Sequence, residues 1–285
     1  MISDIHLSVG PNAVHSIGNQ TIEASVDDTL TDLPVGSLRP SRYLATAAPW
    51  NRVAACILLL PALPVLLVFA VAIRITSSGP VIYRQRRVGL RGREFYVCKL
   101  RTMRQDAETL SGPVWAQRQD PRVTPLGRLL RKLHIDELPQ LWNVLKGEMA
   151  IIGPRPERPE FVCVLSREIP GYLERLSVLP GITGLAQILL PPDSDIVGVR
   201  RKLRQDITYI ENAGLWLDAR IFLSTTLRIC GIPGGLAGRL FGFRLNDSDA
   251  DSSPTELAFA RINAVRAAVH LRGDALSSPS KPKPR

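Results

Sequence analysis

The organisation of this chain follows from the stretch RKLHIDELPQLWNVLKGEMAIIGPRPERPE, residues 131–160. Asp136 and Glu137 stand side by side at its centre, and the apolar spacing of LPQLWNVL predicts a helix after them that ends at Gly147. Amide N–H groups without partners at the start of a helix attract anions. Asp136 alone could be a helix cap without chemistry. The cations around the pair instead favour a site for a phosphorylated substrate and a divalent ion.

Three arginines near the acidic pair are candidates for binding phosphate. Arg131 precedes Asp136 at the end of a predicted helix. Arg155 lies between two prolines, whose fixed backbone angles restrict the loop, and Arg158 could act instead of it or beside it. A planar guanidinium binds an oxyanion through two parallel hydrogen bonds. We therefore predict that Arg131 and Arg155 hold a phosphoryl group, and that His134 is a structural residue.

Three runs, DELPQLWNVLKGEM, GPRP and PGITGLAQ, together resemble the bacterial sugar transferase family, the monotopic polyprenyl-phosphate phosphoglycosyl transferases. The resemblance covers residues 50–232 in the family's order. It implies transfer of a sugar-1-phosphate from a UDP-sugar to polyprenyl (undecaprenyl) phosphate, with release of UMP. This reaction is the first membrane step in assembling exopolysaccharide, O-antigen, capsule or glycoprotein glycans. The resemblance places the enzyme at the bacterial inner membrane, with its catalytic domain facing the cytoplasm and other glycan-assembly enzymes as partners.

The reaction assigns roles to the acidic pair. We expect Asp136 to attack the sugar-linked phosphorus and form a covalent aspartyl-phosphosugar, which polyprenyl phosphate then attacks in a ping-pong mechanism. Glu137 is expected to help hold Mg²⁺ against the diphosphate. The opposite assignment, with Glu137 as the nucleophile, stays open. The alternative function is a catalytically inactive membrane-anchored scaffold of a glycan-assembly complex.

Further basic residues lie between positions 84 and 104. Lys99 and Arg101 match the family's K-[FL]-R-[ST]-M run, so the resemblance implies that they lie near the phosphate site. Most of the arginine-rich run 84–93 is expected to face anionic lipid. Asp206 and Tyr209 match a D-x-x-Y element of the family, for which we expect at most a positional role.

Composition narrows the choice of partners. The chain has 285 residues, a formal net charge of +10 and a pI near 9.9. Such a balance suits nucleic acid, an anionic bilayer or phosphorylated substrates. No nucleic-acid-binding motif is visible, and no aromatic residues are interleaved with the basic clusters. The four cysteines form no C-x-x-C pair, which argues against a zinc site and fits a reducing compartment. We expect a lipid bilayer and phosphate as partners, and no nucleic acid.

Residues 53–73 are apolar throughout and long enough to span a bilayer. Pro61 and Pro64 interrupt the middle of the segment, and a bend there would leave two arms too short to cross. Both flanks are basic, which favours a hairpin that enters and leaves on the cytoplasmic face over a spanning helix. The family is also known for a broken, non-crossing helix. One departure is Leu63, which stands where the family often has Ser.

The expected fold class is α+β and mainly helical, with a small cytoplasmic catalytic domain on a re-entrant membrane helix. We predict a disordered arm over residues 1–41, the re-entrant helix over 42–76 and the catalytic domain over 77–232. A Gly-rich segment and a variable tail follow over 233–285. Residues 215–229 read as an amphipathic helix lying in the membrane interface, with an ordinary core helix as the alternative.

Overall fold

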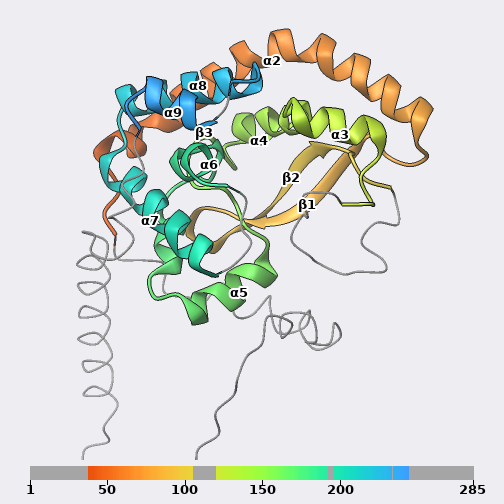
Figure 1. The fold of residues 1–285 in the computed structure, drawn as a ribbon. Coiled ribbons are helices and arrows are strands. Elements are labelled where there is room, and N and C mark those ends of the chain that lie inside the picture. The colour runs from red at the N-terminus through yellow and green to blue at the C-terminus, as the bar shows by residue number, and fades with distance from the viewer. Residues whose placement is uncertain (1–37, 105–119, 192–195, 233, 244–285) are drawn as a thin grey trace, which may run out of the picture.

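The computed structural model describes residues 38–104, 120–191, 196–232 and 234–243. Most of the predicted arm (1–41) and most of the predicted Gly-rich segment and tail (233–285) lie outside these ranges. The described chain is mainly helical and contains two small two-stranded sheets (Figure 1), as the predicted fold class requires.

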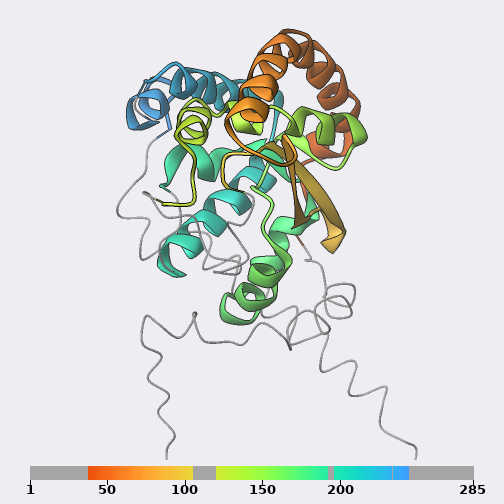
Figure 2. The same cartoon turned by 90° about the vertical axis from the view of Figure 1, so that its right-hand side faces the viewer.

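The apolar segment belongs to a helix of 35 residues, α2 (Arg42–Thr76), which is longer than the apolar run itself. Ser41 caps its start by accepting a hydrogen bond from the Tyr43 amide at 3.3 Å. Helical backbone continues through all three prolines inside it, and each removes a hydrogen-bond donor, a common cause of bending. Figures 1 and 2 show α2 arching over one side of the molecule. Among the described helices, α2 alone is long and apolar enough to cross a membrane.

The two sheets differ in the relative direction of their strands. β1 (Ile82–Val88) and β2 (Glu94–Leu100) make an antiparallel hairpin. A short 3₁₀ turn, η2 (Leu90–Gly92), joins them. β3 (Ala150–Ile152) and β4 (Gly181–Thr183) are parallel, because the helices between them return the chain in the same direction.

The remaining elements are helices and 3₁₀ turns. They are α3 (Pro125–Lys132), η3 (Ile135–Glu137), α4 (Gln140–Lys146), α5 (Pro159–Glu168), η4 (Tyr172–Ser177), α6 (Leu185–Leu189), α7 (Ile196–Asn212), α8 (Leu215–Ile229) and α9 (Gly234–Leu240). Thr124 caps α3 by accepting a hydrogen bond from the Gly127 amide at 2.9 Å, and Pro125 is its first residue. Figure 2 shows α2 and α8 towards one side and α5 at the opposite end.

Separate apolar clusters hold these elements together. α2 packs on β2 and α4 through a cluster that includes Ala55, Phe95 and Val144. A second cluster joins α5, η4 and α7 around Tyr172 and Leu203, both 1% exposed. The elements that carry the acidic pair and the Arg155 loop are therefore braced by packed helices.

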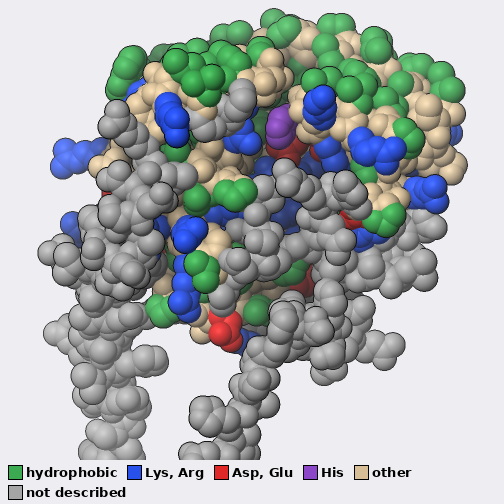
Figure 3. Space-filling model, in the orientation of Figure 1, with side chains coloured by type: hydrophobic (Ala, Val, Ile, Leu, Met, Phe, Trp, Pro, Cys, Tyr) green, Lys and Arg blue, Asp and Glu red, His purple; other side chains and the backbone are tan. Residues whose placement is uncertain are grey.

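Large apolar side chains nevertheless remain exposed on α2, α8 and α9. They include Trp50, Leu60, Leu67, Ile75, Leu215, Trp216, Leu236 and Leu240. Figure 3 shows apolar side chains gathered along the edge where α2 and α8 lie. On α8, Trp216 is 77% exposed whereas Ile221 is 0% exposed, so this helix is buried on one side only. An exposed apolar surface of this kind is compatible with membrane association.

Candidate functional site

The acidic pair lies in a tight turn between two helices. His134 has a left-handed backbone (φ 54°), and the 3₁₀ turn η3 follows it at once and contains Asp136 and Glu137. α4 begins at Gln140, so the pair lies just before a helix, as the sequence predicted. The His134 side chain is exposed, and its left-handed backbone joins α3 to η3.

Glu137 is held by two cations. Its Oε1 accepts hydrogen bonds from Lys99 Nζ at 2.9 Å and from Arg155 Nη2 at 2.6 Å, while its Oε2 lies 3.4 Å from Arg155 Nη1. Burial alone would raise the pKa of Glu137, but Arg155 and Lys99 hold that pKa well below its ordinary value. The Glu137 carboxylate is therefore ionised and fixed in orientation.

Asp136 has the opposite environment. It is 8% exposed, yet no side chain or backbone group among the described residues donates a hydrogen bond to its carboxylate. Burial, together with the charge of Glu137, raises the pKa of Asp136. Among the described residues, the Glu137 carboxylate is fixed by cations, whereas the neighbouring Asp136 carboxylate forms no ion pair.

Three of the five predicted phosphate-binding residues lie close to the acidic pair. Lys99 and Arg155 both contact Glu137. Arg131 lies near enough for its charge to act on Asp136, and its Nε donates to Thr102 Oγ1 at 2.9 Å.

The other two predicted residues have contacts outside the acidic pair. Arg101 donates from Nη2 to the Ser77 carbonyl at 2.8 Å, beyond the end of α2, so the structure does not bring it to the acidic pair. Arg158 precedes α5 and contacts Glu160 at 3.3 Å.

Two contacts at the site were not expected from the sequence. Arg87 donates from Nη1 to the Pro156 carbonyl at 2.9 Å, so it belongs to the Arg155 loop and not to a lipid-facing run. In β1 it lies on the strand face opposite Arg86, and the two-residue alternation of strands was the signal for this difference. Asn143 on α4 is 0% exposed and accepts from the Cys98 amide at 3.0 Å. It joins α4 to the strand that carries Lys99.

The donors for a divalent ion are few. The described residues contain no group of three or more His, Cys, Asp and Glu side chains that could hold a metal. Mg²⁺ is commonly bound through one or two carboxylates together with substrate phosphates. Asp136 and Glu137 supply that minimal set of hard oxygen donors, and the hydrogen bond of Glu137 Oε2 to Arg155 Nη1 is long, at 3.4 Å. The residues present therefore fit Mg²⁺ when a diphosphate supplies the remaining ligands.

Comparison with known proteins gives a consistent result. A family model described as bacterial sugar transferase matches residues 45–231. A UDP-N-acetylgalactosamine-undecaprenyl-phosphate N-acetylgalactosaminephosphotransferase from Aeromonas hydrophila is 44% identical over 199 residues, which cover 70% of this chain and 47% of that protein. A UDP-glucose:undecaprenyl-phosphate glucose-1-phosphate transferase from Xanthomonas campestris pv. campestris is 37% identical over 216 residues, 75% of this chain and 45% of that protein.

A third relative is matched over most of its length. A UDP-glucose:undecaprenyl-phosphate glucose-1-phosphate transferase from Caulobacter vibrioides is 44% identical over 215 residues, 69% of this chain and 79% of that protein. The chain spans about half the length of the first two relatives. Because the family model covers well over half of it, the chain belongs to the bacterial sugar transferase family.

Proposed function

We propose that this chain transfers a sugar-1-phosphate from a UDP-sugar to undecaprenyl phosphate, giving undecaprenyl-diphosphate-sugar and UMP. The printed activities of the relatives support this reaction class. The observation that carries the proposal is the contrast within the acidic pair. Glu137 is fixed by Lys99 and Arg155, whereas Asp136 has a carboxylate without a hydrogen-bond partner among the described residues.

Asp136 is the nucleophile in this proposal. One carboxylate oxygen attacks the phosphorus that bears the sugar, an acyl phosphate bond forms, and the bond to the bridging oxygen breaks so that UMP leaves. An oxygen of undecaprenyl phosphate then attacks the same phosphorus, and the Asp136 carboxylate is released. Two steps allow both phosphorylated substrates to use one anion site in turn. An ion-paired carboxylate would be a poorer nucleophile, so the geometry favours Asp136 over Glu137 for this role.

Lys99, Arg155 and Arg131 would neutralise the phosphoryl group during both steps. An anionic carboxylate attacks an anionic phosphate only if fixed cations offset the charge that accumulates. Without substrate, Glu137 occupies the space between Lys99 and Arg155, so we propose that an incoming phosphate takes over part of those contacts. Glu137 would then be available to hold Mg²⁺, which supplies further charge neutralisation on the diphosphate when it is bound.

We also propose that α2 is re-entrant and that the catalytic domain faces the cytoplasm. The contacts of α2 support this topology, because one small domain holds both of its ends. At the start, Tyr43 Oη donates to Asp218 Oδ2 on α8 at 2.8 Å. At the far end, Ile73 packs with Leu100 and Leu130 in one cluster. A straight spanning helix would carry one end to the opposite side of the bilayer, away from these partners.

Trapping of the covalent intermediate tests the chemistry. Wild-type protein incubated with UDP-sugar labelled in the sugar-linked phosphate should retain label after denaturation, and Asp136→Asn should retain none. Glu137→Gln should still label, but more slowly. Label on Asp136→Asn would refute the proposed nucleophile. Absence of UMP release from every sugar in a UDP-sugar panel with undecaprenyl phosphate would instead favour the inactive scaffold.

Accessibility of the chain ends tests the topology. Tags placed at both termini should be protected from an impermeant reagent added to intact cells. Labelling of the N-terminal tag alone would show that α2 crosses the membrane.

A further inference from the structure

The loop that carries Arg155 is fixed along its backbone. At its start, the Gly181 amide donates to the Pro154 carbonyl at 2.8 Å. At its end, the Val88 amide donates to the Glu157 carbonyl at 2.9 Å. The loop therefore has backbone partners from β4 and β1 on either side of Arg155.

The two carbonyl groups between these ends accept hydrogen bonds from arginine side chains. Arg87 Nη1 donates to Pro156 at 2.9 Å, and Arg175 Nη2 donates to Arg155 itself at 2.8 Å. Arg175 thus bonds to the backbone of the same residue whose guanidinium contacts Glu137. Arg175 can therefore influence the position of the Arg155 guanidinium without contacting the substrate.

Arg175 is itself held by buried partners. Its Nη2 forms an ion pair with Asp206 Oδ2 at 2.9 Å, and its Nη1 donates to Tyr172 Oη at 2.7 Å. The guanidinium carbon lies 5.2 Å from the centroid of the Tyr172 ring. Arg175 is 9% exposed and Asp206 is 2% exposed, so the pair is almost entirely removed from water.

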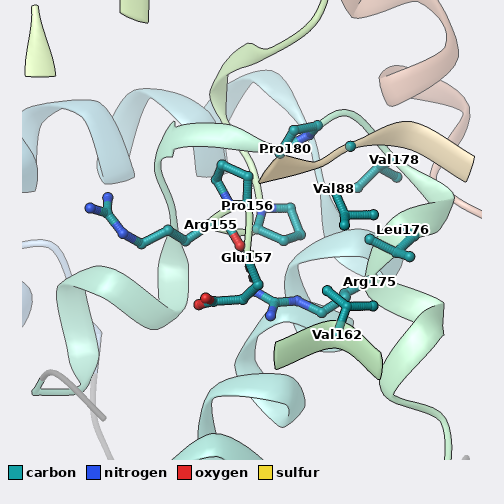
Figure 4. Close-up of a pocket in the computed structure, with 11 residues that line it drawn as sticks. Val88, Arg155, Pro156, Glu157, Val162, Arg175, Leu176, Val178 and Pro180 are labelled. Carbon is teal, nitrogen blue, oxygen red and sulfur yellow. Dashed lines mark hydrogen bonds between the residues drawn. The ribbon is translucent and has the colours of Figure 1, made fainter. Parts of the chain in front are cut away.

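Figure 4 shows Arg175 beneath the loop, beside Val88, Val162 and Leu176, while the Arg155 side chain extends away from them. The cavity that these residues line has a volume of about 10 Å³, which leaves room for at most one water molecule. A buried ion pair in such surroundings adds little to stability, because apolar side chains of similar size would often serve as well. Apolar residues could not donate the hydrogen bond that Arg175 makes to the Arg155 carbonyl.

We propose that Asp206 and Arg175 are positioning residues for the transfer reaction: Asp206 orients Arg175, and Arg175 fixes the Arg155 backbone so that the Arg155 guanidinium is held at the phosphate site. This inference rests on the proposed function of Arg155 as a phosphate ligand. Arg175 and Asp206 affect the substrate only through Arg155.

The test replaces both charges together, in the full-length protein. The double variant Arg175→Met with Asp206→Leu removes the ion pair and the hydrogen bond to Arg155 while retaining buried volume. Leu203→Ala is the matched control, because Leu203 packs in the same apolar cluster as Tyr172 but forms none of the hydrogen bonds or ion pairs that join Arg175 to the loop. Each change is also made in an Arg155→Ala background, and thermal unfolding is recorded for every variant.

We expect the double variant to lower kcat/KM for the UDP-sugar about 100-fold, since a displacement of about 1 Å can have that effect. In the Arg155→Ala background the same double change should alter kcat/KM by about twofold or less, because residues acting through one contact are not additive. Leu203→Ala should lower the unfolding temperature and leave kcat/KM near the wild-type value. A double variant that keeps wild-type kcat/KM, or that loses as much activity without Arg155 as with it, overturns the proposal.

A second measurement does not require activity. Hydrogen–deuterium exchange in a peptide covering residues 153–160 should be faster in the double variant than in wild type, and unchanged by Leu203→Ala. Equal exchange in the double variant and in wild type also overturns the positioning role. If the loop responds as expected but wild type releases no UMP from any UDP-sugar, the proposed function fails and the link between Arg175 and the loop stands.

Discussion

Asn143 offers the sharpest test of how the site is assembled. Its Oδ1 accepts from the Cys98 amide at 3.0 Å, and its Nδ2 donates to the Tyr96 carbonyl at 2.8 Å and to Glu148 Oε2 at 2.7 Å. The side-chain amide thus pairs with the outer edge of β2 in the way that another strand would. Because Lys99 follows Cys98 directly, this pairing fixes the distance between Lys99 and the turn that precedes α4.

Replacing Asn143 with Ala should destabilise the protein by about 2–3 kcal/mol. The change leaves the buried Cys98 amide without its side-chain partner, which costs about 1–3 kcal/mol, and it removes the partly buried hydrogen bond to the Tyr96 carbonyl, which adds less. The contact with Glu148 adds little, because that side chain is 31% exposed and water can replace the partner. Asn143→Asp should be worse than Ala at neutral pH, because a carboxylate would face the Tyr96 carbonyl and Glu148.

Thermal or denaturant unfolding of the purified full-length protein measures this loss. Asn212→Ala is the matched control, since Asn212 makes a single exposed hydrogen bond to the Thr208 carbonyl at 2.9 Å. The control should change the free energy of unfolding by about 0.5 kcal/mol or less. If Asn143→Ala costs no more than Asn212→Ala, the strand-like pairing does not hold β2 to α4 and the reasoning is refuted.

Three further predictions concern packing and ionisation. Gly127→Ala should lower the free energy of unfolding by about 3 kcal/mol through overpacking, because the added Cβ would clash with the Thr102 carbonyl oxygen. Gly214→Ala, which has open space around the added Cβ, is the control in the same unfolding measurement. Because Arg155 and Lys99 lower its pKa, Glu137 binds fewer protons in the folded state than in the unfolded state. Its contribution to stability is therefore complete above the unfolded pKa of about 4.3 and is lost as the pH falls below that value. The free energy of unfolding should decrease less with falling pH in Glu137→Gln than in wild type. Covalent labelling of Asp136 should rise with pH through a pKa above the ordinary value of about 3.9, and a rate that is already constant at about pH 4 would contradict this.

The sequence predicted the elements whose signals are local. Thr124, Pro125 and Gly147 mark helix ends that the structure contains, because caps and left-handed turns depend on a few neighbouring residues. The apolar run 53–73 covers the centre of α2, and the helix extends beyond the run to the bounds 42–76 that the sequence analysis gave for it. Its first turns are held by contacts with distant parts of the chain, including the hydrogen bond from the Ile151 amide to Asn51 Oδ1 at 2.8 Å.

Roles that depend on distant partners could not be predicted in this way. Arg87 lies 69 residues before its partner Pro156, and nothing in the run 84–93 distinguishes it by composition from the arginines beside it. Arg101 matched a family run as well as Lys99 did, yet it contacts the Ser77 carbonyl and not the acidic pair. β2 ends at Leu100, so Lys99 lies within the strand whereas Arg101 lies beyond it, where the strand no longer sets the direction of its side chain.

The same argument explains the acidic pair itself. Asp136 and Glu137 are adjacent and chemically alike, so the sequence left open which of them is the nucleophile. The structure separates them through cations from two distant elements: Lys99 on β2 and Arg155 after β3 both contact Glu137, and neither forms an ion pair with Asp136. The pKa of Glu137 is lowered and that of Asp136 is raised by this one difference in partners together with burial. This division suits the proposed mechanism, in which Asp136 attacks a phosphate that cations neutralise, because a carboxylate bound by both cations is less available to attack.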